Sequence, residues 1–371
     1  FAFGAMLVYT IIIGETIPYT LQLLQLNYWF FERETVIVAF ALVIFLPLSL
    51  MRNVASLSKF SGVAMLCAFT SVGIVLSNVG REKVERPLNF VAPNVFPALG
   101  VMAGAYVCNH NTFIIYRSLK RRSYKRWTHV ANLSVVVACV MLLTIAVGGY
   151  WAFGLEITGN ILTNLPNDAA GSTARICSAI LLSLTFPIEN VVARECITEI
   201  IESCKCARRY LHSQPSSSSS SSSSTQQSTT TTTKQNSSSI QLEENRQASI
   251  DDDDEKINTT STQQPAIVQP TNTTTINESR EAKLSHIITI VSITVVVVLA
   301  IALPDSAIVF ELIGSFSATL LCFILPAASA LRLSKDATKL QLAPMWFLLI
   351  FGIVAMLAGT GNTFYNIVSK P

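Results

Sequence analysis

Nine long apolar runs divide this sequence and leave few folds open to it. A helix that crosses the hydrocarbon core of a bilayer needs about 20 mostly apolar residues. Half of the chain is hydrophobic and only 13% is charged, whereas a soluble domain carries roughly a quarter of charged residues. The sequence therefore predicts an all-α polytopic membrane protein with nine transmembrane helices, at residues 1–26, 36–50, 61–77, 96–116, 130–153, 176–192, 287–303, 307–330 and 345–365.

Basic residues gather in three of the connections between these runs. Two lie at 52–59, six at 117–126 and three at 332–339. Alternating helices place these three connections on the same side of the membrane, and cytosolic loops carry an excess of Lys and Arg. We therefore expect this side to be cytosolic.

A polar segment separates the sixth run from the seventh. Residues 204–283 are dominated by Ser, Thr, Gln and Asn, with an unbroken serine run and an acidic run. Such a composition cannot bury a core, so we expect a disordered cytosolic loop between helical parts at 1–203 and 284–371. Four N-x-S/T triplets in this segment would instead suit a lumenal loop, but such triplets arise by chance in this composition and the basic clusters outweigh them.

Four ionisable side chains lie inside the apolar runs: Glu15, His110, Glu189 and Glu311. Such groups are costly at membrane depth, so each is a candidate for function. Glu15 precedes a proline in GETIP. One interpretation is a carboxylate that lines a pocket or a proton path; the other is a neutral acid bonded to a neighbouring helix. Glu189 lies near the expected cytosolic end of its helix, where it can pair with Arg194. Glu311 lies near an outer end, where it can reach water or gate a vestibule.

Asn109, His110 and Asn111 form a polar stretch within an apolar run. Their donors and acceptors need water, a ligand or another helix, so they line a pathway, clamp a neighbouring helix or mark a polar helix end. Gly100 and Gly104 upstream form a G-x-x-x-G face, which predicts a close approach of another helix. A histidine here can titrate near neutral pH, but no neighbouring residues complete a metal site.

Ser183 and Thr185 precede a proline in the sixth run. Hydroxyl oxygens and the carbonyl oxygens freed by a proline are ligands that sodium accepts. The alternative is ordinary bonding of both hydroxyls to their own helix. From the residues alone, both interpretations stay open.

Motifs of enzymes and channels are missing from the sequence. It contains no phosphate-binding glycine loop, no H-E-x-x-H, no C-x-x-C pair and no nucleophile elbow, which would mark common enzyme classes. Arginine-rich voltage-sensing helices and T-V-G-Y-G filters are absent as well, so a selective channel has no support. We therefore expect no enzyme, no cofactor and no nucleic-acid partner, with the lipid bilayer as the surroundings.

Five stretches carry a resemblance to a known family. They are GETIP from Gly14, LPLSLMRNVASLSKFS from Leu46, YVCNHNTFIIYRSL from Tyr106, VGGYWAFG from Val147 and SLTFPIENVVARE from Ser183. In this order they resemble the amino acid/auxin permease family and, within it, the sodium-coupled neutral amino acid transporters. The likeness covers nearly all of the membrane part and fails only across the Ser/Thr-rich segment.

This resemblance implies a leucine-transporter-like fold of eleven helices, in which two inverted five-helix repeats surround a midplane site. The nine runs would then be helices three to eight in 1–203 and nine to eleven in 284–371. The first two helices would be missing, so we expect a truncated record of a longer protein. The stretch around His110 would belong to the helix that opens the second repeat, which is typically interrupted near the substrate. Thr185 would lie on the eighth helix, which supplies a hydroxyl to the ion.

The expected function is secondary active transport of small neutral amino acids by alternating access, coupled to sodium or protons, in the plasma membrane or a lysosome-like membrane. We expect the substrate pathway to include Asn109, His110, Asn111, Glu15 and Glu311, and the cation site to include Ser183 and Thr185. A rival is a nutrient receptor that binds an amino acid and signals through its cytosolic segment. A truncated form without function is a third possibility.

Overall fold

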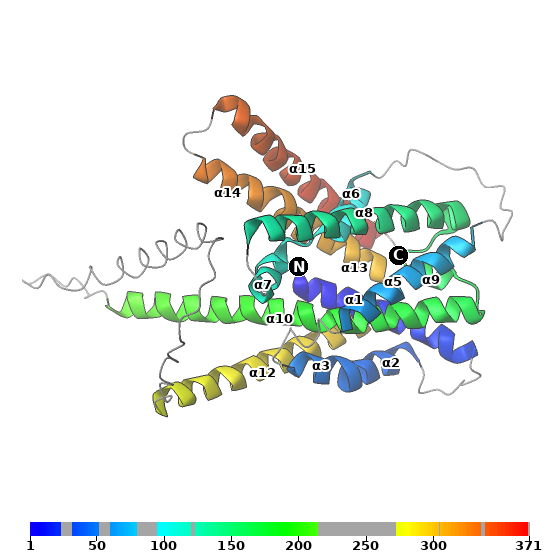
Figure 1. Ribbon diagram of the computed structural model, residues 1–371, viewed down its shortest axis with the longest axis horizontal. Coiled ribbons are helices and arrows are strands. Elements are labelled where there is room, and N and C mark those ends of the chain that lie inside the picture. The colour runs from blue at the N-terminus through cyan, green and yellow to red at the C-terminus, as the bar shows by residue number, and fades with distance from the viewer. Residues whose placement is uncertain are drawn as a thin grey trace, which may run out of the picture. The chain divides into compact units, whose positions relative to one another are not determined.

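The computed structural model describes residues 1–23, 32–51, 60–79, 95–119, 123–213, 272–303, 305–334 and 338–369. Every regular element in these ranges is a helix. The α-helices are α1 (Ala2–Leu23), α2 (Arg33–Phe40), α3 (Leu46–Leu50), α5 (Ser61–Ser77), α6 (Val95–Tyr106), α7 (Thr112–Ser118), α8 (Tyr124–Phe153), α9 (Ile161–Asn164), α10 (Ala169–Ser213), α12 (Asn272–Ala302), α13 (Ser306–Ile313), α14 (Leu325–Leu333) and α15 (Lys339–Ser369) (Figure 1).

Short helices of other types continue or interrupt them. The π-helices are η2 (Ala41–Phe45), η6 (Gly314–Ala318) and η7 (Leu320–Ile324), and the 3₁₀ turns are η4 (Asn109–Asn111) and η5 (Gly154–Glu156). The chain divides into a larger unit, Phe1–Ser203 with Arg280–Pro371, and a smaller unit, Cys204–Ser279.

Seven helical stretches in the described part of the chain are long and apolar enough to cross a membrane, and they correspond to seven of the nine predicted runs. The third predicted run forms the shorter apolar helix Ser61–Ser77. The fourth run is not one helix, because α6 ends at Tyr106 and η4 precedes α7. The all-helical, polytopic architecture is thus confirmed, whereas the number of crossings and the inverted repeat stay predictions.

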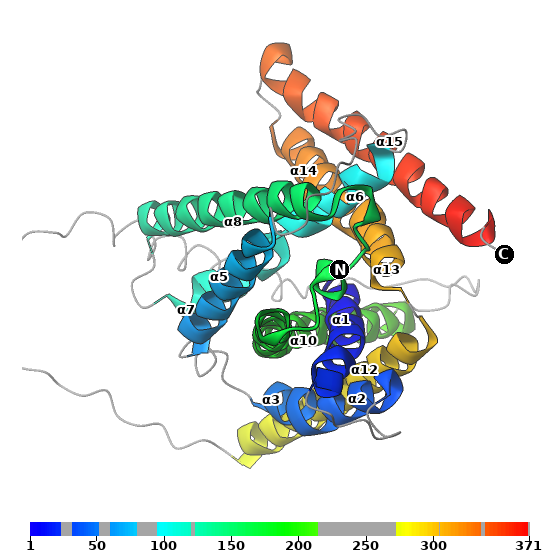
Figure 2. The same ribbon diagram turned by 90° about the vertical axis from the view of Figure 1, so that its right-hand side faces the viewer.

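The main core lies where α1, η2, α10 and α12 meet. Figure 2 shows α1, α10 and α12 grouped with α2 and α3, which flank η2 in the chain. Met6 and Ile13 of α1 and Val296 of α12 are almost completely buried. The rings of Phe45 and Phe186 stack with centroids 4.0 Å apart. Because α1 carries apolar residues around most of its circumference, it can fill the interior of a helical bundle.

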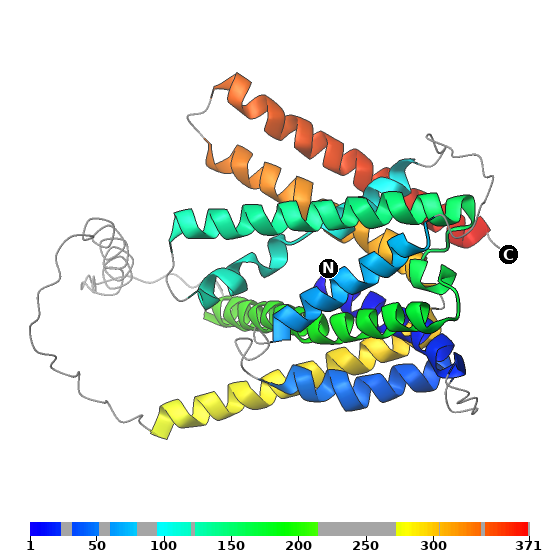
Figure 3. The ribbon, with the colours of Figure 1, turned by 45° about the vertical axis from the view of Figure 1, so that its right-hand side comes forward.

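The apolar face of α8 points away from the rest of the described chain. Leu133, Val136, Val140 and Val147 repeat at helical spacing and are 67%, 58%, 59% and 60% exposed. An apolar face of this length would be unfavourable in water, whereas lipid chains can cover it. This helix therefore fits a position at the lipid-facing perimeter, next to α5, beside which it runs in Figure 3.

The predicted close approach at the G-x-x-x-G face is confirmed. A Cβ atom added to Gly100 would overlap Ser315 Oγ, and one added to Gly314 would overlap the carbonyl oxygen of Gly100. Gly104 faces Gly314 as well. Backbone contact between α6 and η6 therefore requires residues without side chains at these positions.

The ends of the polar segment are helical where the structure describes them. Helix α10 continues to Ser213 and α12 begins at Asn272, so both extend past the limits of 204 and 283 that we expected for the loop. The predicted disorder of 214–271 lies outside the described residues, as do the basic residues at 52–59 and parts of the clusters at 117–126 and 332–339. The cytosolic orientation remains a prediction.

Candidate functional site

A cavity of about 290 Å³ lies beside the interruption between α6 and α7. Its wall combines α1, α6, the interruption itself, α10 and α13, so segments far apart in the sequence contribute to it. Most of the lining is apolar or aromatic, and the polar side chains come from His110, Asn111 and Glu189 with Tyr9 and Cys108 nearby. Such a mixture is typical of small-molecule sites, and the volume lies at the low end of their range.

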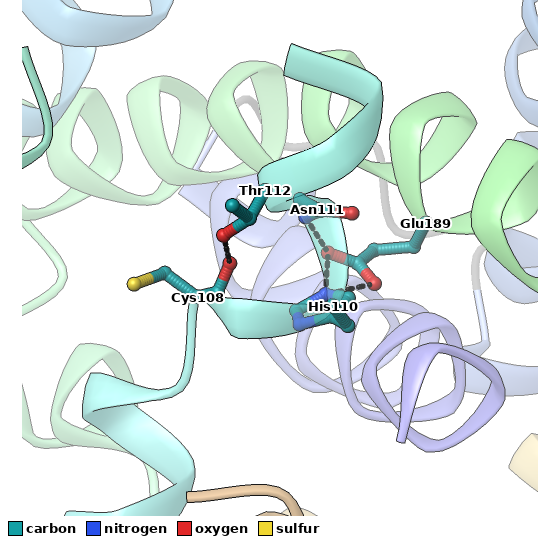
Figure 4. Close-up of polar contacts among 5 residues, drawn as sticks. All are labelled: Cys108, His110, Asn111, Thr112 and Glu189. Carbon is teal, nitrogen blue, oxygen red and sulfur yellow. Dashed lines mark hydrogen bonds and ion pairs between the residues drawn. The ribbon is translucent and has the colours of Figure 1, made fainter. Parts of the chain in front are cut away.

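Glu189 of α10 organises the polar wall (Figure 4). His110 Nε2 lies 3.1 and 3.0 Å from the two carboxylate oxygens. Asn111 Nδ2 donates to Glu189 Oε1 at 3.2 Å. The side chains of His110 and Glu189 are only 9% and 5% exposed. Removing one partner of such a shielded pair leaves a polar group uncompensated, so the three residues depend on one another.

The interruption brings these side chains to α10. Cys108 has φ −131° and ψ 0°, which is not helical, and Asn111 N and Thr112 Oγ1 both donate to the Cys108 carbonyl at 3.4 Å. Asparagine side chains compete with helical backbone bonds and favour such turns. The interruption that the family resemblance implied is therefore present at this stretch.

Two polar atoms at this wall have no hydrogen-bond partner among the described residues, His110 Nδ1 and Asn111 Oδ1. With Glu189 ionised, Nε2 is the donor between its two oxygens, because a carboxylate only accepts hydrogen bonds. In the neutral ring Nδ1 is then an acceptor. Asn111 uses its amide nitrogen toward Glu189, which leaves its oxygen as a second acceptor.

The structure separates Asn109 from its two neighbours. Its side chain is exposed, and Nδ2 donates to the carbonyl oxygen of Leu321 in η7 at 3.4 Å. Successive residues of a 3₁₀ turn point about 120° apart, so the three polar side chains cannot share one face. His110 and Asn111 line the cavity, whereas Asn109 is not among its lining residues.

The two expected cation ligands lie on α10 but differ in their bonding. Thr185 Oγ1 donates to the Leu181 carbonyl at 2.8 Å, which is the bonding to its own helix that was the alternative interpretation. Ser183 Oγ is buried and has no partner among the described residues. Residues two apart on a helix do not face one another, so these hydroxyls point in different directions.

The remaining two acidic candidates bond to neighbouring helices outside the cavity. Glu15 Oε2 accepts from Asn160 Nδ2 at 2.8 Å and lies 3.0 Å from Ser306 Oγ, and Oε1 accepts from the Ser306 amide at 3.1 Å. The carboxylate therefore covers the N-terminus of α13, where free N–H groups attract negative charge. Glu15 also lines a separate pocket of about 360 Å³. Glu311 Oε1 accepts from Thr363 Oγ1 of α15 at 2.8 Å.

Sequence reasoning missed Glu189 as a member of the site. The sequence places it at membrane depth but offers Arg194 of the same helix as its partner. The partner that the structure reveals, His110, lies 79 residues away. The available signal was that both residues are costly at membrane depth.

Arg175 was missed altogether, because it precedes the sixth apolar run by one residue. It is completely buried on α10. Its Nε and Nη2 atoms donate to the carbonyl oxygens of Leu162 and Leu165 at 3.1 and 2.6 Å, and its guanidinium lies 5.3 Å from the Tyr19 ring centroid. Arg175 therefore holds the α9 turn against the end of α1. In the described ranges, no three His, Cys, Asp or Glu residues are placed to hold a metal ion.

Comparison with known proteins gives the family. A family model described as "Transmembrane amino acid transporter protein" matches residues 1–365. The chain is 32% identical over 209 residues to the Rattus norvegicus protein named "Putative sodium-coupled neutral amino acid transporter 11", which covers 54% of this chain and 46% of that protein. It is 30% identical over 227 residues to "Vacuolar amino acid transporter 2" of Saccharomyces cerevisiae, covering 57% and 46%.

The matched region thus spans about half the length of these relatives. The family match extends over nearly the entire chain, including the interruption and the helices that form the cavity. The relatives are named as transporters and not as enzymes. The resemblance to amino acid/auxin permeases is therefore confirmed, and the chain belongs to the family of transmembrane amino acid transporter proteins.

Proposed function

We propose that this protein moves small neutral amino acids across a membrane by alternating access, with the cavity at the α6–α7 interruption as the substrate site. The observation that carries this proposal is the polar wall of His110, Asn111 and Glu189 in an otherwise apolar cavity. An amino acid has a donor-rich ammonium group, and this wall offers a carboxylate and two acceptors that have no partner among the described residues. Opposite charge and hydrogen-bond complementarity favour that group here.

The apolar part of the cavity supports a neutral side chain. Ala5, Val8, Phe310 and Ile313 line it, and none of them can compensate a charged side chain, whose burial is costly. A volume of about 290 Å³ suits a substrate of the size of alanine or glutamine. Larger or charged amino acids should be poor substrates.

The interruption itself supports alternating access. Helices broken at membrane depth give transporters both exposed backbone groups for ligands and a point of bending. Here the interrupted helix contacts η6 and η7, and π-helical turns of this kind occur frequently at functional sites. We infer that α6 and α7 can tilt independently around the cavity.

Cation coupling is proposed from α10. Thr185 retains oxygen lone pairs after its hydroxyl has donated to Leu181. The buried Ser183 oxygen has no partner among the described residues, but it points in another direction and would not bind the same ion. Hydroxyl oxygens of this kind suit a sodium ion. The name of the rat relative includes sodium coupling, whereas the yeast relatives are named vacuolar, so both the plasma membrane and a lysosome-like membrane are candidate locations.

Uptake by the protein in liposomes tests this function. Radiolabelled L-alanine and L-glutamine should accumulate, more so with an inward sodium gradient than with the sodium replaced by choline at constant pH. Absence of uptake for any neutral amino acid would refute the transport function.

A matched pair of variants tests the sodium site. Thr185→Ala should abolish the sodium stimulation, and Thr185→Ser should preserve it. Thr198→Ala is the control, because Thr198 lies on the same helix and makes the same bond to its own backbone, with Arg194, at 2.8 Å. Uptake that persists and ignores both sodium and Thr185→Ala would refute the sodium assignment and leave transport intact.

A further inference from the structure

The pocket of about 360 Å³ near the C-terminal end of α1 carries two opposite charges. Glu15 of α1 and Arg33 of α2 line it, together with the uncharged polar side chains of Tyr19, Gln22 and Thr163. We call it the Glu15–Arg33 pocket. It shares no lining residue with the cavity beside the interruption, so it is a separate space with its own chemistry.

Arg33 has hydrogen-bond donors to spare in this pocket. Its Nη2 atom donates to the carbonyl oxygens of Ala300 and Leu303 at 2.8 and 2.7 Å. Its Nε atom is buried and has no partner among the described residues. A buried donor without a partner costs free energy, and a guanidinium group is always charged and matches the geometry of a carboxylate. A ligand with a carboxylate would therefore complete the bonding of Arg33.

Glu15 keeps room for one more donor. Its carboxylate accepts three hydrogen bonds, from Asn160 Nδ2, the Ser306 amide and Ser306 Oγ, whereas an ionised carboxylate offers roughly four acceptor positions. A Cβ atom added to Gly14 would lie 3.3 Å from Arg33 Cγ, so the stem of Arg33 passes α1 next to Glu15. No ion pair joins these two described side chains. The two charges thus face one pocket without neutralising each other.

This pair of charges selects the type of ligand. A simple anion is attracted by Arg33 but repelled by Glu15, and the reverse holds for a simple cation. A molecule with an ammonium group and a carboxylate is attracted by both, through charge-assisted hydrogen bonds. The other polar side chains of the lining are uncharged, so they favour a ligand whose own side chain is uncharged as well.

We propose that the Glu15–Arg33 pocket is a second binding site for a neutral α-amino acid, whose ammonium group binds Glu15 and whose carboxylate binds Arg33. This inference rests on the proposed function, because it takes the transported amino acid as the ligand. Tyr9 lines the cavity and Glu15 lines the pocket, and a helix rises about 1.5 Å per residue, which places them about 9 Å apart along α1. Two amino acids can therefore be bound at once, with α1 in the wall of both sites.

The first test counts the bound ligand. Equilibrium binding of radiolabelled L-alanine and L-glutamine to the purified full chain in detergent should saturate at two molecules per protein. The side chain of Gln22 is exposed at the pocket, so a larger residue there fills the pocket without disturbing the core. Gln22→Trp should lower the count to one, whereas Gln22→Ala leaves the pocket open and should retain both molecules.

The second test identifies the groups of the ligand that are recognised. Glu189→Gln takes the carboxylate from the cavity and should leave one bound molecule, the one in the Glu15–Arg33 pocket. In this variant L-alaninamide lacks the carboxylate for Arg33, and N-acetyl-L-alanine lacks the ammonium group for Glu15. Each should displace bound L-alanine at least about tenfold less effectively than L-alanine itself. Equal displacement by L-alaninamide would refute the pairing with Arg33, and equal displacement by N-acetyl-L-alanine would refute the pairing with Glu15.

The counts separate this inference from the function beneath it. If the unmodified protein saturates at one molecule, which Glu189→Gln removes and Gln22→Trp retains, the second site is refuted and the proposed function stands. If that single molecule is instead lost in Gln22→Trp and retained in Glu189→Gln, the pocket stands and the cavity is not the substrate site. If no amino acid binds to the monodisperse protein, both fail.

Discussion

Gly314→Ala tests the close contact that holds the broken helix in place. The added Cβ would overlap the carbonyl oxygen of Gly100 and approach the backbone nitrogen of Val101. Both obstacles are backbone atoms of α6, so no side chain can rotate to make room. Overpacking of this kind costs about 1–3 kcal/mol, and a backbone obstacle places this case at the upper end of that range. The gain in helix propensity from glycine to alanine, about 1 kcal/mol, offsets only part of this cost.

The net destabilisation expected for Gly314→Ala is therefore about 2 kcal/mol. Gly73→Ala on α5 is the matched control, because a Cβ there meets nothing within 4 Å and should stabilise the helix by up to about 1 kcal/mol. The two substitutions are chemically identical and should act with opposite signs. Because Gly314 also lines the cavity, Gly314→Ala should weaken amino acid binding as well.

The measurement is thermal stability in detergent, followed by size-exclusion chromatography of heated samples of the purified protein. The midpoint is the temperature at which the monodisperse peak falls to half of its unheated height. Gly314→Ala should lower this temperature, and Gly73→Ala should leave it unchanged or raise it. If Gly314→Ala is as stable as Gly73→Ala, α6 and η6 are not in backbone contact. The arrangement of the cavity wall would then be wrong.

Substitutions at three further residues test contacts between helices by the same heating assay. Glu15→Ala removes the acceptor of the Ser306 amide and should cost about 1–2 kcal/mol. Glu15→Gln keeps an acceptor oxygen and should cost less; equal losses in the two variants would contradict the role of the acceptor oxygen. Arg175→Lys should destabilise the protein by about 2–3 kcal/mol, because a single ammonium group cannot reproduce the two guanidinium hydrogen bonds to carbonyl oxygens of the α9 turn. A variant as stable as the unmodified protein would refute the role of these two bonds. Thr363→Val should cost about 1–3 kcal/mol, since it leaves Glu311 Oε1 without its hydroxyl partner. Thr363→Ser should preserve the bond, and equal stability of the two variants would refute its contribution.

Local patterns in the sequence were sufficient for much of the architecture. Seven of the nine predicted runs coincide with helices long enough to cross a membrane, because hydrophobicity and length decide whether a segment can leave water. Gly100 and Gly104 predicted close helix packing, because a residue without a side chain lets a neighbouring backbone approach, whichever helix that neighbour is. The family resemblance added the interruption at His110, which the apolar pattern alone did not contain.

The sequence by itself determined most of the helical segments. It also determined which polar side chains need a partner, because burying them unpaired at membrane depth costs free energy. Only the tertiary structure decided the partners, since His110 meets Glu189 across 79 residues and Glu15 meets Ser306 across 291. It also turned Asn109 away from the cavity that His110 lines. The physical reason is that the periodicity of a helix specifies which face is apolar, whereas the direction of a polar side chain and the helix it meets depend on how the helices pack.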